Sequence, residues 1–158
     1  MFNHAYSPFI CALQEVEDVW IPTCFPNLED VTIQDCHGRL HIEALPTFTR
    51  LCSLDLKGCR HALDISVLAS CTNLETLNLS SSGVQDLSPL SMCANLRKLD
   101  ISGNGKLGLQ IQVLAPCTNL SELMVAGCRI RDTIDPFVHV PIKRRPTLAH
   151  KSTYNRPP

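Results

Sequence analysis

The stretch "CANLRKLDISGN", residues 93–104, has a spacing that recurs along the chain. It places leucines at Leu96 and Leu99, an isoleucine at Ile101 and an asparagine at Asn104. Four more stretches share this spacing: Leu28-Val31-Ile33-Cys36, Leu51-Leu54-Leu56-Cys59, Leu74-Leu77-Leu79-Ser82 and Leu120-Leu123-Val125-Cys128. Because the first leucines are 23, 23, 22 and 24 residues apart, the chain is an array of similar units.

Each unit predicts one short strand followed by a compact return. In "LRKLDI" the residues alternate, so Leu99 and Ile101 are expected to face a core while Asp100 faces outward. The return "GVQDLSPLSMCANL" contains proline and serine and has no long helical period, which favours short 3-10 turns over full helices. Stacked units would then form a parallel sheet on one side and a wall of turns on the other.

This spacing resembles the leucine-rich repeat, whose pattern is L-x-x-L-x-L-x-x-N/C-x-L. The stretch "VQDLSPLSMCANLRKLDISGN" is similar to the short repeats of internalins and of the leucine-rich regulatory subunit of type-1 protein phosphatase, except that cysteine replaces leucine three residues before the leading leucine. The cysteines at the N/C position are also similar to those of F-box substrate receptors, although no F-box segment is recognisable. The resemblance implies an α/β solenoid, a curved coil with a parallel concave sheet and mainly short 3-10 or loop segments on its convex side.

The repeat array is predicted to cover residues 1–137, with about six repeats. The first repeat is degenerate: aligning it with the fourth places Tyr6 on Leu74, Phe9 on Leu77 and Cys11 on Leu79. This leaves no room for a separate N-terminal cap, so the chain is either a fragment of a longer solenoid or has its first coil covered by another element. Residues 138–158 form a basic, proline-containing tail that is expected to be mobile, while "IDPFVHV", residues 134–140 at the junction, is expected to fold over the last coil.

Composition excludes several functional classes. The formal net charge of -1 gives no general attraction to nucleic acid or to an anionic membrane surface. No apolar run is long enough to cross a bilayer, and the N-terminal segment does not resemble a signal peptide. These features predict an intracellular, cytoplasmic protein, with a nuclear location as an alternative because of the "KRRP" stretch in the tail.

The nine cysteines are interpreted as core residues rather than disulfide partners. They recur in two inward columns, at the N/C position (Cys36, Cys59, Cys128) and on the convex side (Cys71, Cys93, Cys117). A zinc site built from Cys36, His37, Cys59 and His61 is the less favoured alternative, because these spacings differ from common zinc motifs. No catalytic or cofactor motif is present, so we expect neither an enzyme nor a bound cofactor.

The predicted binding site is the outward face of the strands, where small and polar side chains form columns across the coils. An unidentified protein is the expected partner, without specific nucleic acid; the oligomeric state is left open. The alternatives are a structural segment of a longer array and a substrate receptor lacking its F-box. Asp55 and Asp100 also fit a purely structural role within the repeat pattern. The ten predicted contact residues are Thr32, Gln34, Asp55, Lys57, Thr76, Asn78, Lys98, Asp100, Glu122 and Met124.

Overall fold

The computed structural model describes residues 9–12, 18–21, 23, 26–60, 63–105 and 109–129, the first of these ranges by its backbone alone. The predicted tail (138–158), the "IDPFVHV" segment and the start of the first repeat at Tyr6 lie outside these ranges. The predicted division of the chain at residue 137 therefore stays a prediction.

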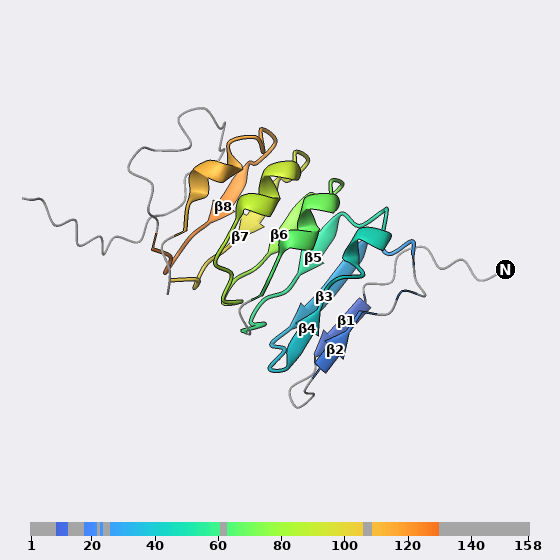
Figure 1. Ribbon diagram of the computed structural model, residues 1–158. Helices are drawn as coiled ribbons and strands as arrows, with labels where there is room; N and C mark the ends of the chain where they lie inside the picture. Colours follow the sequence, from blue (N-terminus) through green and yellow to red (C-terminus); the bar gives the residue numbers. More distant parts are fainter. Residues whose placement is uncertain are drawn as a thin grey trace, which may run out of the picture.

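The main sheet forms one side of the solenoid, as predicted. Among the described residues it has six strands in the order β1-β3-β5-β6-β7-β8, and every neighbouring pair is parallel. Figure 1 shows these strands following one another along the molecule, one for each coil. Phe9 of the degenerate first repeat pairs with Val31, which confirms the proposed alignment of that repeat. The strands are β1 (Phe9–Ala12), β3 (Asp30–Gln34), β5 (Ser53–Asp55), β6 (Thr76–Asn78), β7 (Lys98–Asp100) and β8 (Glu122–Met124).

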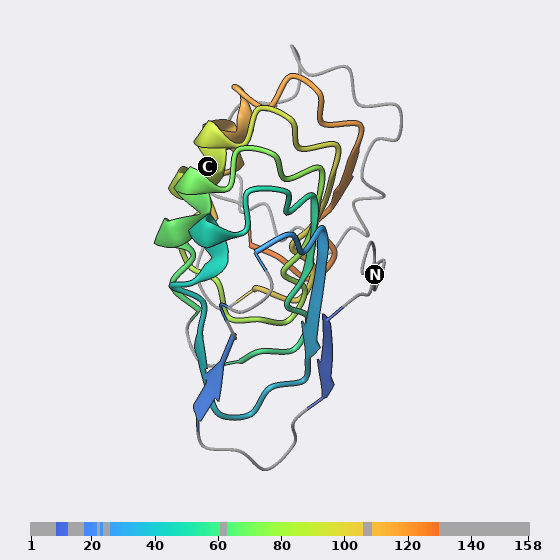
Figure 2. The same cartoon turned by 90° about the vertical axis from the view of Figure 1, so that its right-hand side faces the viewer.

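Short 3-10 helices form the opposite wall, which confirms the predicted absence of long helices there. Figure 2 shows them stacked across the coil from the main sheet. Each helix turns one or two apolar side chains inward, and the next coil covers them. The helices are η1 (Leu45–Thr47), η2 (Ser66–Ser70), η3 (Ser88–Met92) and η4 (Ile111–Leu114).

A second, smaller sheet departs from the sequence-based expectation. Strands β2 (Asp18–Trp20) and β4 (Arg39–His41) pair in parallel on the side of the coil away from the main sheet, where the repeat alignment predicted loop or turn (Figure 2). In β2 the exposed Asp18 and Trp20 flank Val19, which is buried at 4% exposure. In β4 Arg39 is exposed, and Leu40 packs partly against the core. The first two coils are thus flattened into two sheets, whereas later coils keep the predicted turns.

The core is one continuous cluster of mainly aliphatic side chains between the main sheet and the 3-10 helices. Ile33, Leu56, Leu79 and Ile101 are fully buried and occupy the same place in four successive coils. Burying one such side chain contributes about 1.5–3 kcal/mol relative to leaving it exposed. No coil could bury its own leucines alone, so stability depends on contacts between neighbouring coils.

Polar groups inside the solenoid are joined by hydrogen bonds from one coil to the next. Cys93 Sγ donates to the carbonyl of Leu68 at 3.3 Å, and Cys117 Sγ donates to that of Leu90 at 3.2 Å. The convex cysteines are buried, as predicted, and the three thiols at the N/C position also face inward, although Cys128 is only half-buried. The seven cysteines whose side chains the structure describes are free thiols.

Candidate functional site: the outer face of the main sheet

The ten predicted contact residues all lie on or directly beside the strands of the main sheet. Strand pairing aligns the central column Thr32, Asp55, Asn78, Asp100 and Met124, in which each residue is the register partner of the next. A parallel column contains Thr76, Lys98 and Glu122. In β5, β6 and β7 the outward residues flank one fully buried leucine, so the alternation inferred from the sequence is confirmed.

Three members of the central column hold the turns that follow their strands. Asp55 Oδ1 accepts the backbone amide of Lys57 at 3.0 Å, and Asn78 Oδ1 accepts that of Ser80 at 2.9 Å. Asp100 Oδ1 likewise accepts the amide of Ser102 at 2.8 Å. These side chains belong to the scaffold as well as to the surface, because their carbonyl or carboxylate oxygens organise the backbone locally.

Other polar groups on this face are paired with one another. Gln34 Nε2 donates to Asp55 Oδ2 at 2.7 Å, and Lys98 Nζ lies 3.2 Å from Glu122 Oε1. Exposed ion pairs of this kind contribute little to stability. Among the ten residues, two are positively and three negatively charged, so the face is nearly neutral, which suits a polar partner surface better than a strongly charged one.

The remaining predicted residues are available for contact. Thr32 and Thr76 are half-buried on the strands, and Lys57 is exposed and makes no ion pair with any described side chain. Met124 is 49% exposed at the end of the central column. This end of the face therefore offers the largest apolar contact among the predicted residues.

The cysteine thiols are unsuited to catalysis. Burial raises the pKa of Cys59 and of Cys71 to about 11 and that of Cys93 to about 12. These groups remain protonated at neutral pH, whereas a thiol nucleophile or metal ligand must be deprotonated. Within the described ranges, no group of three or more His, Cys, Asp or Glu side chains is placed to hold a metal ion. His61 of the alternative zinc site lies outside those ranges.

Sequence reasoning missed a ladder of asparagines in the turns before β6, β7 and β8. Asn73, Asn95 and Asn119 each donate from Nδ2 to a carbonyl of the preceding coil, at 2.8, 3.0 and 2.9 Å. Their signal was present in the repeated "CTNL", "CANL" and "CTNL". The ladder fixes the spacing of successive strands and so positions the outer face.

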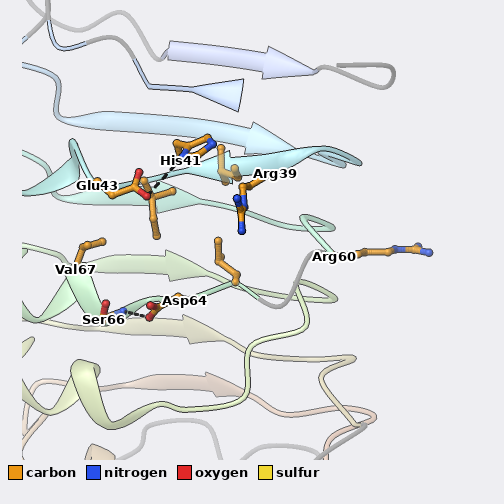
Figure 3. Close-up of a pocket in the computed structure, with 10 residues that line it drawn as sticks. Arg39, His41, Glu43, Arg60, Asp64, Ser66 and Val67 are labelled. Carbon is orange, nitrogen blue, oxygen red and sulfur yellow. Dashed lines mark hydrogen bonds and ion pairs between the residues drawn. The ribbon is translucent and has the colours of Figure 1, made fainter. Parts of the chain in front are cut away.

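Sequence reasoning also missed a pocket beside the second sheet, which we call the β4 pocket. It has a volume of about 780 Å³ and lies between β4 and residues 60 and 63–67 of the next coil (Figure 3). His41 of its lining stacks on Trp20, with ring centroids 3.7 Å apart and planes 2° from parallel. Trp20 is 68% exposed. It is the chain's single tryptophan, and this is the feature of the sequence that could have drawn attention to the region.

Comparisons with known proteins agree with the repeat assignment. The sequence model for leucine-rich repeats, in two copies, matches residues 72–116. An internalin of Listeria monocytogenes aligns with a TM-score of 0.58 at 25% identity, over 72% of this chain and 33% of that chain. Internalin C2 of the same organism aligns with a TM-score of 0.57 at 26% identity, over 75% of this chain and 51% of that chain.

A leucine-rich-repeat protein of Leptospira interrogans shares the fold at 21% identity and a TM-score of 0.57, over 66% of this chain and 26% of that chain. The chain thus spans from about a quarter to about half of the length of these structures. No curated protein sequence matches it significantly. In the part of the chain that the structure describes, no helix has the length and apolar character needed to cross a membrane.

Proposed function

Because the chain is a leucine-rich-repeat protein similar in structure to the internalins, we propose that it binds a partner protein through the outer, concave face of its main sheet. Repeat solenoids commonly mediate protein–protein interaction through such extended faces. The observation that carries the proposal is the continuous register of outward-facing side chains from Thr32 to Met124 across five strands. The proposed role is non-catalytic.

Within this face we assign contact and scaffold roles to different residues. Thr32, Lys57, Thr76 and Met124 are the proposed contact residues, together with the Lys98–Glu122 pair. The side chains of Asp55, Asn78 and Asp100 hold turns, so replacing them would alter the backbone as well as the surface. They are therefore poor choices for testing the site, even though they lie at its centre.

The test uses affinity capture from the native cell with the full chain. Thr76→Arg places a long charged side chain in the middle of the face, and the same substitution at exposed Thr118, in the turn before β8, is the matched control. We expect Thr76→Arg to lose a partner that wild type and Thr118→Arg both retain. A partner retained equally by all three proteins would show that the concave face is not the binding site.

We also propose an intracellular location, as the composition suggests. The seven free thiols in the described ranges, five of them buried, suit a reducing compartment. Microscopy of the tagged chain tests the location, and comparison with a chain in which "KRRP" is replaced by alanines tests the nuclear alternative. A nuclear signal that disappears in the replaced chain would assign a targeting role to the tail.

A further inference from the structure

Strand β4 has one edge that no described strand covers. β4 pairs with β2 on one side, and this two-stranded sheet ends there. In the next coil, described residues 63–65 form no strand that continues it, although Leu63 and Ile65 lie one repeat after Leu40 and Ile42 and are buried. A strand edge presents unpaired N–H and C=O groups, which makes it a template for pairing with another extended segment.

The β4 pocket lies directly beside this edge. Leu40, Leu63 and Val67 contribute apolar surface to its lining, between the strand and the start of η2. Its volume of about 780 Å³ falls within the range of roughly 300–1,000 Å³ that is usual for binding sites in proteins. An extended segment next to β4 would therefore find both backbone partners and room for apolar side chains.

Arg39 is the group of the lining that favours an acidic occupant. The lining also holds Arg60 and two acids: Glu43 Oε1 lies 3.6 Å from His41 Nδ1, and Asp64 Oδ1 accepts the amide of Ser66 at 2.9 Å. Arg39 makes no ion pair with any described side chain. In Figure 3 its guanidinium points from β4 toward the segment that carries Asp64, whereas Arg60 extends outward at the end of the pocket.

We propose that the β4 pocket binds an extended acidic peptide segment of a partner protein, which adds as a strand along the free edge of β4. Addition of a strand to a sheet edge derives affinity from backbone hydrogen bonds and specificity from alternate side chains. One acidic side chain of the peptide would pair with Arg39, and an apolar side chain would contact Leu63 and Val67. This surface lies across the coil from the concave face and does not depend on the function proposed for that face.

The experiment selects a displayed library of random heptapeptides on the full chain and titrates the enriched peptides in solution. Trp20 is the readout, because it is the single tryptophan and stacks on His41 of the pocket lining. We expect enriched peptides that alternate apolar and acidic residues and give a saturable fluorescence change. Arg39→Ala should weaken binding about tenfold or more, as expected for loss of a charge-assisted hydrogen bond.

Three controls make the outcome decisive. Arg97→Ala removes a matched exposed arginine that pairs with Glu75 far from β4, and it should leave the affinity unchanged. N-methylation of alternate peptide amides should abolish binding if the peptide pairs with β4. The proposal is overturned if no peptide is enriched, if Arg39→Ala binds like wild type, if N-methylated peptides bind equally well, or if a synthetic peptide of residues 141–158 occupies the pocket instead.

Discussion

Replacement of Asn104 by alanine tests the internal hydrogen bonding on which the coil geometry depends. The Asn104 side chain is 4% exposed, and its Nδ2 donates to the carbonyls of Leu79 and Ile101, each at 2.8 Å. Its Oδ1 accepts the amide of Gly83 at 2.8 Å. One side chain thus links the turn after β7 to the preceding coil through two bonds and to Ile101 of its own coil through a third.

The expected loss of stability depends on which hydrogen bonds the three partner groups of Asn104 keep in the variant. The carbonyl of Leu79 also accepts Ser82 Oγ at 2.5 Å, and that of Ile101 accepts Cys128 Sγ at 2.8 Å, so each keeps at least one donor. Losing the two bonds to them costs about 1 kcal/mol each, and leaving the Gly83 amide unpaired costs about 1–3 kcal/mol more. The total is about 3–5 kcal/mol, which for a chain of this size lowers the Tm by roughly 6–20 °C.

The assay is urea unfolding followed by circular dichroism, for wild type and three variants. Asn119→Ala is the matched control, because that exposed asparagine makes a single bond to the Ala94 carbonyl and should cost about 1 kcal/mol or less. Asn104→Cys should fall between the two, since Cys59 Sγ in the corresponding position donates to the Ile33 carbonyl at 3.3 Å. If Asn104→Ala were no more destabilising than Asn119→Ala, the buried hydrogen bonds of Asn104 would contribute no more to stability than one exposed hydrogen bond, and the reasoning would be refuted.

Two further predictions concern the turns and the thiols. Gly103 has a φ of +76° and an added Cβ would lie 2.6 Å from Ser81 Oγ, so Gly103→Ala should destabilise the chain by at least about 1 kcal/mol in thermal unfolding, whereas a neutral effect would contradict the strained geometry. Burial raises the pKa of Cys93 from 9.0 to about 12, so this thiol stabilises the fold fully below pH 9, and its contribution falls as the pH rises from 9 toward 12. Between pH 9 and 11 the free energy of unfolding of Cys93→Ser should therefore fall less steeply with pH than that of wild type, by about 1.4 kcal/mol per pH unit. A slope identical to that of wild type would contradict the assignment.

The repeat spacing predicted the main sheet because it constrains every coil in the same way. Leu99 can face the core only if Lys98 and Asp100 face outward, and the next coil must repeat this pattern in register to bury Leu123. The repeat spacing therefore determines the strands, their order and the columns of outward-facing residues. The inward positions of the cysteines follow from the same argument, and the structure confirms them.

The second sheet and its pocket were not predictable in this way. Among the described residues, only the first two coils have a strand at this position in the repeat, at residues 18–20 and 39–41. The repeat spacing therefore does not distinguish these segments from the turns of later coils. Their pairing depends on Val19 and Leu40 meeting the core together, which is a tertiary effect. The scaffold role of Asn78 likewise became visible only from the position of the Ser80 amide.

The two proposed binding surfaces can be tested separately because of the way a solenoid is built. Each coil contacts only its neighbours, so a substitution at Arg39 in the second coil has no direct contact with Thr76 in the fourth. Changes at sites that share no partners are usually additive in free energy. A variant carrying both Arg39→Ala and Thr76→Arg should therefore lose peptide binding and partner capture to the same extent as the corresponding single variants. A departure from additivity would indicate that one partner contacts both sides of the solenoid, and the two surfaces would then form a single interface.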